Sequence, residues 1–252
     1  MPFPETDVDA GQRPDGTEGA EGTEGSRVLP AAVLWDMDGT LIDSEQYWMA
    51  AEHELVRSHG GVWTHEDALS LVGNPLDASA EILQAHGVDL SVDEIITFLI
   101  TRVTARVSAE VPWQPGAVEA LAWLRELDVP CALVTMSYRS LADAFVERTP
   151  AGTFAAVVTG DEVTHGKPHP EPYLRAAEIL GVRIEDCLVV EDSPAGIGSA
   201  LACGGIPVGV EVLVPLSDSP RLTRLPSLRD LTPDLVDRVV RGEVIDLLAP
   251  TA

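Results

Sequence analysis

Five short, uninterrupted apolar runs, separated by helix-like segments, constrain the fold of this chain more than any other feature. In order along the chain, they cover residues 31–35, 131–135, 155–159, 187–191 and 207–210. Continuously apolar runs, as opposed to alternating ones, are typical of strands that are covered on both faces. Strands that alternate with helices through short connections predict an α/β protein with a doubly wound parallel sheet.

Segments with apolar residues at helical spacing fill the later gaps between the runs. They predict helices over residues 116–127, 138–147 and 172–180, and a closing helix over residues 233–240. Ser137 precedes the second of these helices as a favourable N-cap residue. Gly181 follows the third helix, where glycine commonly ends a helix. One further strand is expected after about residue 211.

The long gap between the first and second apolar runs contains no strand-like run. Its helix-like stretches lie near residues 46–59, 65–72, 76–86 and 92–109. We therefore expect a helical cap domain over residues 44–115, inserted into a core domain that combines residues 28–43 with 116–252. Residues 1–27 are rich in Gly, Glu, Asp and Thr and bury no apolar surface, so we expect a disordered acidic tail there.

The composition narrows the classes of function. A net charge of −25 argues against nucleic acids and anionic membranes as partners, since both require a basic face. No apolar stretch approaches the about 18 residues of a membrane-spanning helix. The three cysteines are scattered and odd in number, which indicates reduced thiols and a cytoplasmic location. We expect a monomer or a weak dimer.

Acidic side chains follow the first predicted strand directly. Asp36 and Asp38 are two residues apart, and on an extended chain such residues face the same side. Together they repel each other unless a cation is bound, and Mg²⁺ suits one or two carboxylates with a substrate phosphate. Gly39 allows a sharp turn immediately afterwards. The sequence therefore predicts a magnesium site after the first strand.

Other polar groups follow the later strands, and parallel sheets bind ligands at these strand ends. Thr135-Met136-Ser137 offers hydroxyls and free N–H groups where a helix opens, which favours an anion. Lys167 follows the third run and is the single lysine beside fifteen arginines. Glu191 and Asp192 end the fourth run with two more carboxylates. The strand ends thus combine acid, hydroxyl and ammonium groups, as metal-assisted phosphoryl binding requires.

These residues resemble the motifs of the haloacid dehalogenase superfamily, in the branch with a helical cap after the first strand. The first motif is Asp36-Met-Asp-Gly-Thr-Leu-Ile-Asp-Ser-Glu45. Thr135, Lys167 and the pair Glu191-Asp192 match the second, third and fourth motifs in order and spacing. The resemblance covers about residues 31–210. It implies a Mg²⁺-dependent phosphatase that acts on a small phosphorylated metabolite.

The resemblance also implies a role for each matching residue. Asp36 would attack phosphorus and carry an aspartyl-phosphate intermediate. Asp38 would give a proton to the leaving oxygen and later take one from water. Thr135 and Lys167 would bind the phosphoryl oxygens.

The metal ligands implied by the resemblance come from the first and fourth motifs. They are the carboxylates of Asp36, Glu191 and Asp192 and the backbone carbonyl of Asp38. The three other residues expected to touch substrate from the core are Ser137, Met136 and Arg139.

Substrate choice is expected to come largely from the cap, through Gln46, Trp48 and Asn74. Polar Gln46 and Arg139 would suit a sugar or polyol phosphate, whereas Trp48 has the alternative role of packing the cap helices. Two other functions remain open. A sugar-phosphate mutase similar to beta-phosphoglucomutase needs a grip on two phosphates, and the cap offers no arginine near Asn74 for it. A catalytically silent phosphate-binding protein would keep the fold without turnover.

Histidines are not expected to form a metal site. His165 and His169 are four residues apart, but Gly166 and Pro168 lie between them, so the two side chains do not share a helix face.

Overall fold

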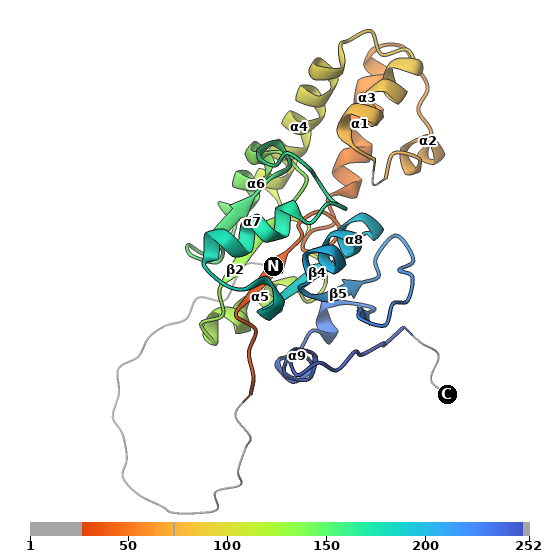
Figure 1. Cartoon of the computed structure of the whole chain (residues 1–252). Helices are drawn as coiled ribbons and strands as arrows, with labels where there is room; N and C mark the ends of the chain where they lie inside the picture. The colour runs from red at the N-terminus through yellow and green to blue at the C-terminus, as the bar shows by residue number, and fades with distance from the viewer. Residues whose placement is uncertain (1–26, 73, 249–252) are drawn as a thin grey trace, which may run out of the picture.

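The computed structural model describes residues 27–72 and 74–248, so the predicted tail lies outside the described residues except for Arg27. Within the described residues, six parallel strands form one sheet in the order β3-β2-β1-β4-β5-β6. The strands are β1 (Ala32–Trp35), β2 (Cys131–Val134), β3 (Ala156–Val158), β4 (Cys187–Glu191), β5 (Ile206–Val210) and β6 (Thr223–Leu225). The predicted doubly wound parallel α/β sheet is confirmed, and Figure 1 shows it at the centre of the molecule.

Helices fill the connections between the strands. They are α1 (Glu45–Ser58), α2 (His65–Leu69), α3 (Leu76–Ala85), α4 (Val92–Ala109), α5 (Ala117–Glu126), α6 (Arg139–Val146), α7 (Glu171–Leu180), α8 (Pro194–Cys203) and α9 (Pro233–Val240). Three 3₁₀ turns are η1 (Gly160–Glu162), η2 (Ile184–Asp186) and η3 (Leu228–Asp230). None of the helices in the described part of the chain is long and apolar enough to span a bilayer.

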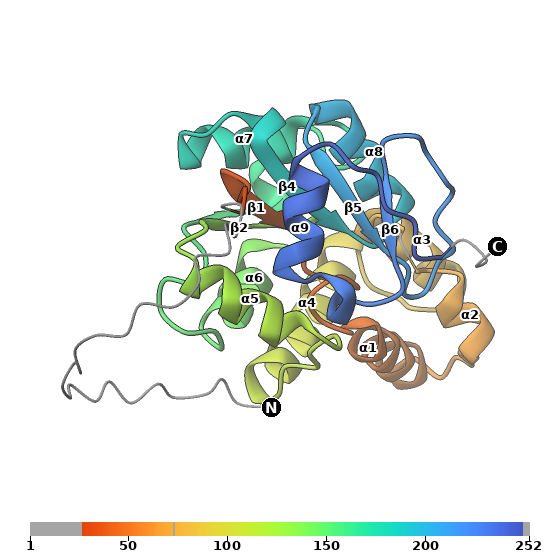
Figure 2. The same cartoon turned by 90° about the horizontal axis from the view of Figure 1, so that it is seen from below.

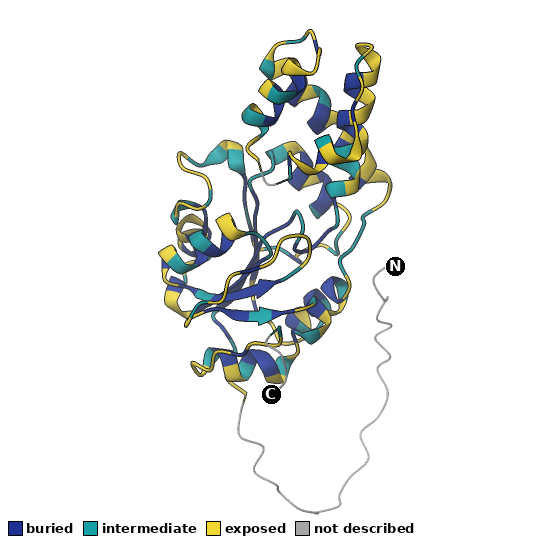
Figure 3. Ribbon diagram, turned by 90° about the vertical axis from the view of Figure 1, so that its right-hand side faces the viewer, coloured by how far each residue is buried: buried dark blue, intermediate teal, exposed yellow. Residues whose placement is uncertain are grey.

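The sheet separates two apolar layers, because successive side chains of a strand point to opposite faces. Leu34 packs with Tyr173 and Ala200, which belong to α7 and α8. Its neighbour Trp35 lies in the layer on the other face, which also contains residues of α5, α6 and α9. Figure 2 shows α7 and α8 on one side of the sheet and α5 and α9 on the other. Strands β1, β2 and β4 are buried throughout, as their apolar composition predicts (Figure 3).

Helices α1 to α4 form a helical block that is inserted between β1 and β2 (Figure 1). Two linkers connect this block to the sheet, and they run side by side. Asp43 N–H donates to the carbonyl of Pro112 (2.7 Å), and Gln114 N–H donates to the carbonyl of Leu41 (2.9 Å). The helical insertion is therefore confirmed, while the domain boundaries at residues 44 and 115 stay a prediction.

Local signals explain where these helices begin. Thr64 and Ser91 each form a reciprocal capping box with the residue three positions on, at the starts of α2 and α4. The predicted cap at Ser137 is wrong. Helix α6 begins one residue later, after Tyr138, because the Ser137 hydroxyl donates to a carboxylate of the first strand end instead.

Candidate active site

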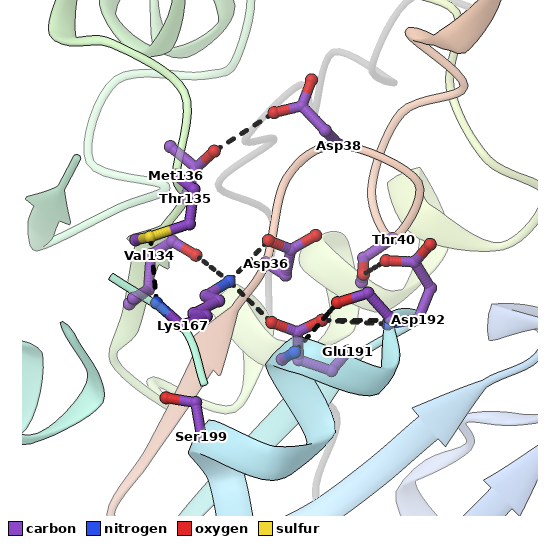
Figure 4. A network of polar contacts seen from close by, with 12 residues as sticks. Asp36, Asp38, Thr40, Val134, Thr135, Met136, Lys167, Glu191, Asp192 and Ser199 are labelled. Carbon is purple, nitrogen blue, oxygen red and sulfur yellow. Dashed lines mark hydrogen bonds and ion pairs between the residues drawn. The ribbon is translucent and has the colours of Figure 1, made fainter. Parts of the chain in front are cut away.

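The carboxyl ends of β1, β2 and β4 lie next to one another, because β1 pairs with both other strands. Asp36 directly follows β1, Thr135 follows β2, and Glu191 is the last residue of β4. The loop after β3 brings Lys167 to the same place (Figure 4). The topology thus collects at one edge the polar residues that are far apart along the chain.

Lys167 is the centre of the polar network. Its ammonium donates to Asp36 Oδ1 (2.6 Å) and to the carbonyl of Val134 (2.8 Å), and it pairs with Glu191 Oε1 at 2.6 Å. The lysine side chain is only 4% exposed. Burial alone would lower the pKa of Lys167, but the charges of Asp36 and Glu191 outweigh it and raise this pKa. The two acids therefore favour the charged form of the lysine.

Glu191 is completely buried and is surrounded by donors. The Tyr173 hydroxyl donates to Oε1 (2.7 Å). The Ser193 hydroxyl donates to Oε2 (3.1 Å), as does the backbone N–H of Asp192 (3.2 Å). A Cβ atom at Gly196 would lie 1.8 Å from Glu191 Cδ, so only glycine allows α8 to pass this close. These donors fix the Glu191 carboxylate, which in turn pairs with the ammonium of Lys167.

Asp38 is held by three hydroxyl groups. Ser44 donates to Oδ1 (2.6 Å), while Thr135 and Ser137 donate to Oδ2 (3.1 and 2.8 Å). Ser44 comes from the residue before α1, and the other two come from the end of β2. The carboxylate of Asp38 is therefore fixed between the helical block and the sheet.

Asp192 lies on the far side of the turn that follows β1. The Thr40 hydroxyl donates to Asp192 Oδ1 (2.9 Å). Gly39 has φ +91°, and a Cβ atom there would fall 2.1 Å from Asp192 Oδ2. The predicted sharp turn at Gly39 is confirmed, and the glycine also makes room for the acid. Burial and the charge of Glu191 raise the pKa of Asp192 to about 7.

The donor set fits a divalent cation. Asp36, Glu191 and Asp192 each offer a carboxylate oxygen, and these atoms lie within 4.8 Å of one another. Asp36 Oδ2 is buried and has no hydrogen-bond partner. Burial, followed by the charge of Glu191, raises the pKa of Asp36 well above its usual value. Oxygen ligands of this kind suit Mg²⁺, which would relieve the unpaired oxygen.

The remaining predicted site residues differ in placement. Met136 lies at the network, since its Sδ accepts the N–H of Lys167 (3.3 Å). Arg139 instead donates to Glu162 (2.6 Å) and lies 3.6 Å from Asp143, so acids of the core hold its guanidinium. The three cap residues have partners outside the network: Gln46 donates to Asp43, Asn74 donates to the carbonyl of Ser70, and Trp48 packs on the apolar layer.

Sequence reasoning missed three supporting residues, Thr40, Ser44 and Tyr173. Thr40 and Ser44 stand inside the first motif, so their position could have indicated a role. Tyr173 gives no signal in the sequence, because it reads as one apolar residue of an amphipathic helix. Its hydroxyl reaches Glu191 only because α7 packs on β1, β2 and β3, next to β4.

Together, the parallel sheet and this acidic centre with a buried lysine define an α/β enzyme of the phosphoryl-transfer type. Residues 33–210 match the family model of the haloacid dehalogenase-like hydrolases. The chain belongs to this family, and the resemblance found in its motifs is confirmed.

Curated relatives cover most of the chain. Hexitol phosphatase A of Escherichia coli K12 is 31% identical over 217 residues, which span 84% of this chain and 96% of the relative. Validoxylamine A 7'-phosphate phosphatase of Streptomyces hygroscopicus subsp. limoneus is 33% identical over 179 residues, or 71% of this chain and 84% of the relative. Both relatives carry the name of a phosphatase, which agrees with the enzyme class predicted from the motifs.

Solved structures share the fold. CbbY from Rhodobacter sphaeroides, in complex with phosphate, has a TM-score of 0.71 at 23% identity and covers 81% of this chain and 96% of its own. Beta-phosphoglucomutase from Clostridium difficile has a TM-score of 0.67 at 19% identity, with 84% and 98% covered. At these identities the likeness concerns the fold alone.

Proposed function

We propose that this enzyme is a Mg²⁺-dependent phosphatase that hydrolyses a small phosphorylated metabolite through an aspartyl-phosphate on Asp36. One observation carries the proposal. Lys167 holds one oxygen of Asp36 at 2.6 Å, while the other oxygen is buried without a partner. A carboxylate fixed at one oxygen, beside further metal-type ligands, is prepared for in-line attack on phosphorus.

Mg²⁺ bound by Asp36, Glu191 and Asp192, with the backbone carbonyl of Asp38, would neutralise the charge of nucleophile and phosphate. The protein's own side chains orient the nucleophile and bind the phosphoryl group. Lys167 orients Asp36 and, with the substrate present, offers its ammonium to a phosphoryl oxygen. Thr135 lies at the end of β2, and its hydroxyl, which donates to Asp38 here, would turn to a second phosphoryl oxygen when substrate binds.

Asp38 acts as acid and base in this proposal. It donates a proton to the leaving oxygen when Asp36 attacks, and it then takes a proton from the water that cleaves the aspartyl-phosphate. The hydroxyls of Ser44, Thr135 and Ser137 hold this carboxylate in a fixed position at the strand ends, as transfer of a proton to and from the reacting group requires.

We assign the substrate to the class of sugar or polyol phosphates. The names of the relatives, a hexitol phosphatase among them, support this class. The helical block over residues 44–115 would act as a cap that selects the substrate, with Gln46, Trp48 and Asn74 in contact with it. The paired linkers at Asp43 and Gln114 are suitable hinges for such a cap. The enzyme would act in the cytoplasm as a monomer or a weak dimer.

A phosphatase assay tests the proposal. With MgCl₂ present, the purified protein is expected to release inorganic phosphate from members of a panel of hexitol, pentose and triose phosphates. This release is expected to stop when EDTA is added. Asp36→Asn is expected to abolish turnover while the circular dichroism spectrum and melting temperature stay those of a folded protein. Metal-dependent turnover by Asp36→Asn would remove Asp36 as nucleophile. Conversion of one sugar phosphate into its isomer, dependent on a bisphosphate, would indicate a mutase instead.

A further inference from the structure

A second group of metal-type ligands lies outside the acidic centre, on the outer side of the loop that carries Lys167. It consists of His165, His169 and Glu171, and its three ligand atoms lie within 4.8 Å of one another. Both histidines are exposed, so an ion reaches them directly from solvent. Sequence analysis did not predict this group, because Gly166 and Pro168 lie between the histidines and keep them from a common helix face.

The loop conformation brings the three side chains together. His165 Nδ1 lies 2.9 Å from Glu171 Oε2, and the rings of His165 and His169 are 4.5 Å apart between centroids. The Glu171 carboxylate also accepts the N–H groups of Thr164 (2.7 Å) and His165 (3.0 Å). These bonds fix the carboxylate in place beside the two imidazole rings.

The donor set is that of a zinc site. Two imidazoles and one carboxylate, with an open fourth position, form a common Zn²⁺ arrangement. In a tetrahedral site the ligand atoms are about 3.3 Å apart, given metal–ligand bonds of about 2.0–2.1 Å. The pair His165–Glu171 already has nearly this spacing. His169 already offers a ring nitrogen within 4.8 Å of the other two ligand atoms, and its Nδ1 accepts the N–H of Glu171 (3.2 Å).

We propose that His165, His169 and Glu171 form a second metal site, specific for Zn²⁺ or a similar transition-metal ion and separate from the magnesium site. The three ligands bracket Lys167. On its inner side the loop is fastened by Ser199, whose hydroxyl donates to the carbonyl of His169 (2.7 Å), and by Met136, whose Sδ accepts the N–H of Lys167. Figure 4 shows Ser199 on α8, below the acidic centre. A metal on the outer side adds a third attachment to the loop that positions the ammonium.

Isothermal titration of the full chain with ZnCl₂, under saturating MgCl₂, tests the site. The wild type is expected to bind one Zn²⁺ ion in a binding event that persists under saturating MgCl₂. Its melting temperature is expected to rise as ZnCl₂ is added. The double variant His165→Ala/His169→Ala is expected to lose the event. The loss in affinity is expected to exceed the about 10–100-fold that is typical of removing a residue that only supports a ligand.

Matched variants separate this site from other zinc-binding groups. His53→Ala/His65→Ala removes two exposed histidines of the helical block and is expected to keep the event. Asp192→Asn weakens the acidic centre and is also expected to keep it. Glu171→Gln retains the shape of the side chain but is expected to weaken binding. Co²⁺ in place of Zn²⁺ is expected to show visible absorption bands of tetrahedral nitrogen and oxygen coordination in the wild type and in both control variants, but not in His165→Ala/His169→Ala.

Two results would overturn the proposal. One is that Asp192→Asn removes all Zn²⁺ binding seen in the wild type, which would place the ion in the acidic centre. The other is a His165→Ala/His169→Ala variant that binds Zn²⁺ with the stoichiometry and affinity of the wild type. Neither result bears on the proposed phosphatase activity, since that activity is measured with MgCl₂ and without transition metals.

Discussion

Replacement of Lys167 by methionine tests the central electrostatic feature of the site. Methionine has about the length and volume of the lysine stem but carries no charge. The substitution therefore leaves the packing almost unchanged and leaves Asp36 and Glu191 facing each other without the ammonium. Their side chains are 10% and 0% exposed, so solvent does little to compensate.

The expected magnitude follows from the contacts that are lost. Lys167 makes two ion pairs at 2.6 Å and one hydrogen bond to the carbonyl of Val134 at 2.8 Å. Removing one partner of a buried ion pair costs about 3–5 kcal/mol, because a charge is left buried and unpaired. Uptake of a proton by a carboxylate limits this cost. The loss of unfolding free energy is therefore expected to be largest at high pH and smaller under acidic conditions.

Urea denaturation of the metal-free protein measures this loss, and a second substitution identifies its cause. Glu191→Gln in the Lys167→Met background removes one of the two unpaired charges, and is expected to recover about 2 kcal/mol or more. Arg102→Met is the control, because it breaks an ion pair with Glu54 that is about half exposed. This control is expected to cost less than about 1 kcal/mol.

Activity separates stability from catalysis. Loss of a group that stabilises transition-state charge costs about 10²–10³ in kcat, so Lys167→Met is expected to lose at least that much in a steady-state phosphate-release assay. The double variant with Glu191→Gln is expected to regain stability but no turnover. The reasoning fails if Lys167→Met unfolds within about 1 kcal/mol of the wild type at neutral pH, or if its turnover stays within about tenfold.

Two further substitutions test buried groups elsewhere. Glu52 is 5% exposed, and burial, followed by the charge of Glu45, raises its pKa from 4.5 to about 8. The folded state thus keeps a proton that the unfolded state loses near pH 4.5, so stability falls as pH rises from about 4.5 to about 8, by up to about 4–5 kcal/mol. Glu52→Gln is expected to gain on the wild type by this amount between these pH values in urea titrations, and parallel pH profiles would contradict the pKa. Gly196→Ala forces a methyl group onto Glu191 and is expected to cost about 2 kcal/mol or more in thermal unfolding; an unchanged melting temperature would show that α8 shifts freely.

The sequence predicts elements best where one local signal decides them. The run 187–191 and strand β4 have the same bounds, as do the predicted closing helix and α9. In the first case a buried strand must be apolar throughout. In the second, Thr232 caps the helix and Pro233 opens it. For β6 the sequence predicts only that a strand follows residue 211, without bounds. Its middle residue is the polar Arg224, and its place is decided by pairing with β5.

The order of the strands lies beyond any local signal. The central position of β1 depends on its pairing with β2 and β4. Strand β2 follows β1 only after the helical block, and β4 follows after two further connections. The sequence shows which side chains follow strands, and parallel topology brings them to one edge. It does not show that Ser137 turns toward Asp38 instead of capping α6, because Asp38 is 99 residues away along the chain and a serine before a helix predicts only the local cap.

The charge balance of the site explains why its reacting residues are visible in the sequence and its supporting residues are not. Asp36, Glu191 and Asp192 place three buried carboxylates around one ammonium, which leaves two negative charges when all are ionised. Burial raises the pKa of Asp36 and Asp192 accordingly, and a divalent cation is the smallest partner that restores neutrality. Such a centre requires particular charged groups at fixed strand ends, so each appears as an acid that directly follows or ends an apolar run, or as the single lysine of an arginine-rich chain. The hydroxyl of Tyr173 only completes the shell of Glu191, and a residue that adds a hydrogen bond to an otherwise apolar surface leaves no comparable trace in the sequence.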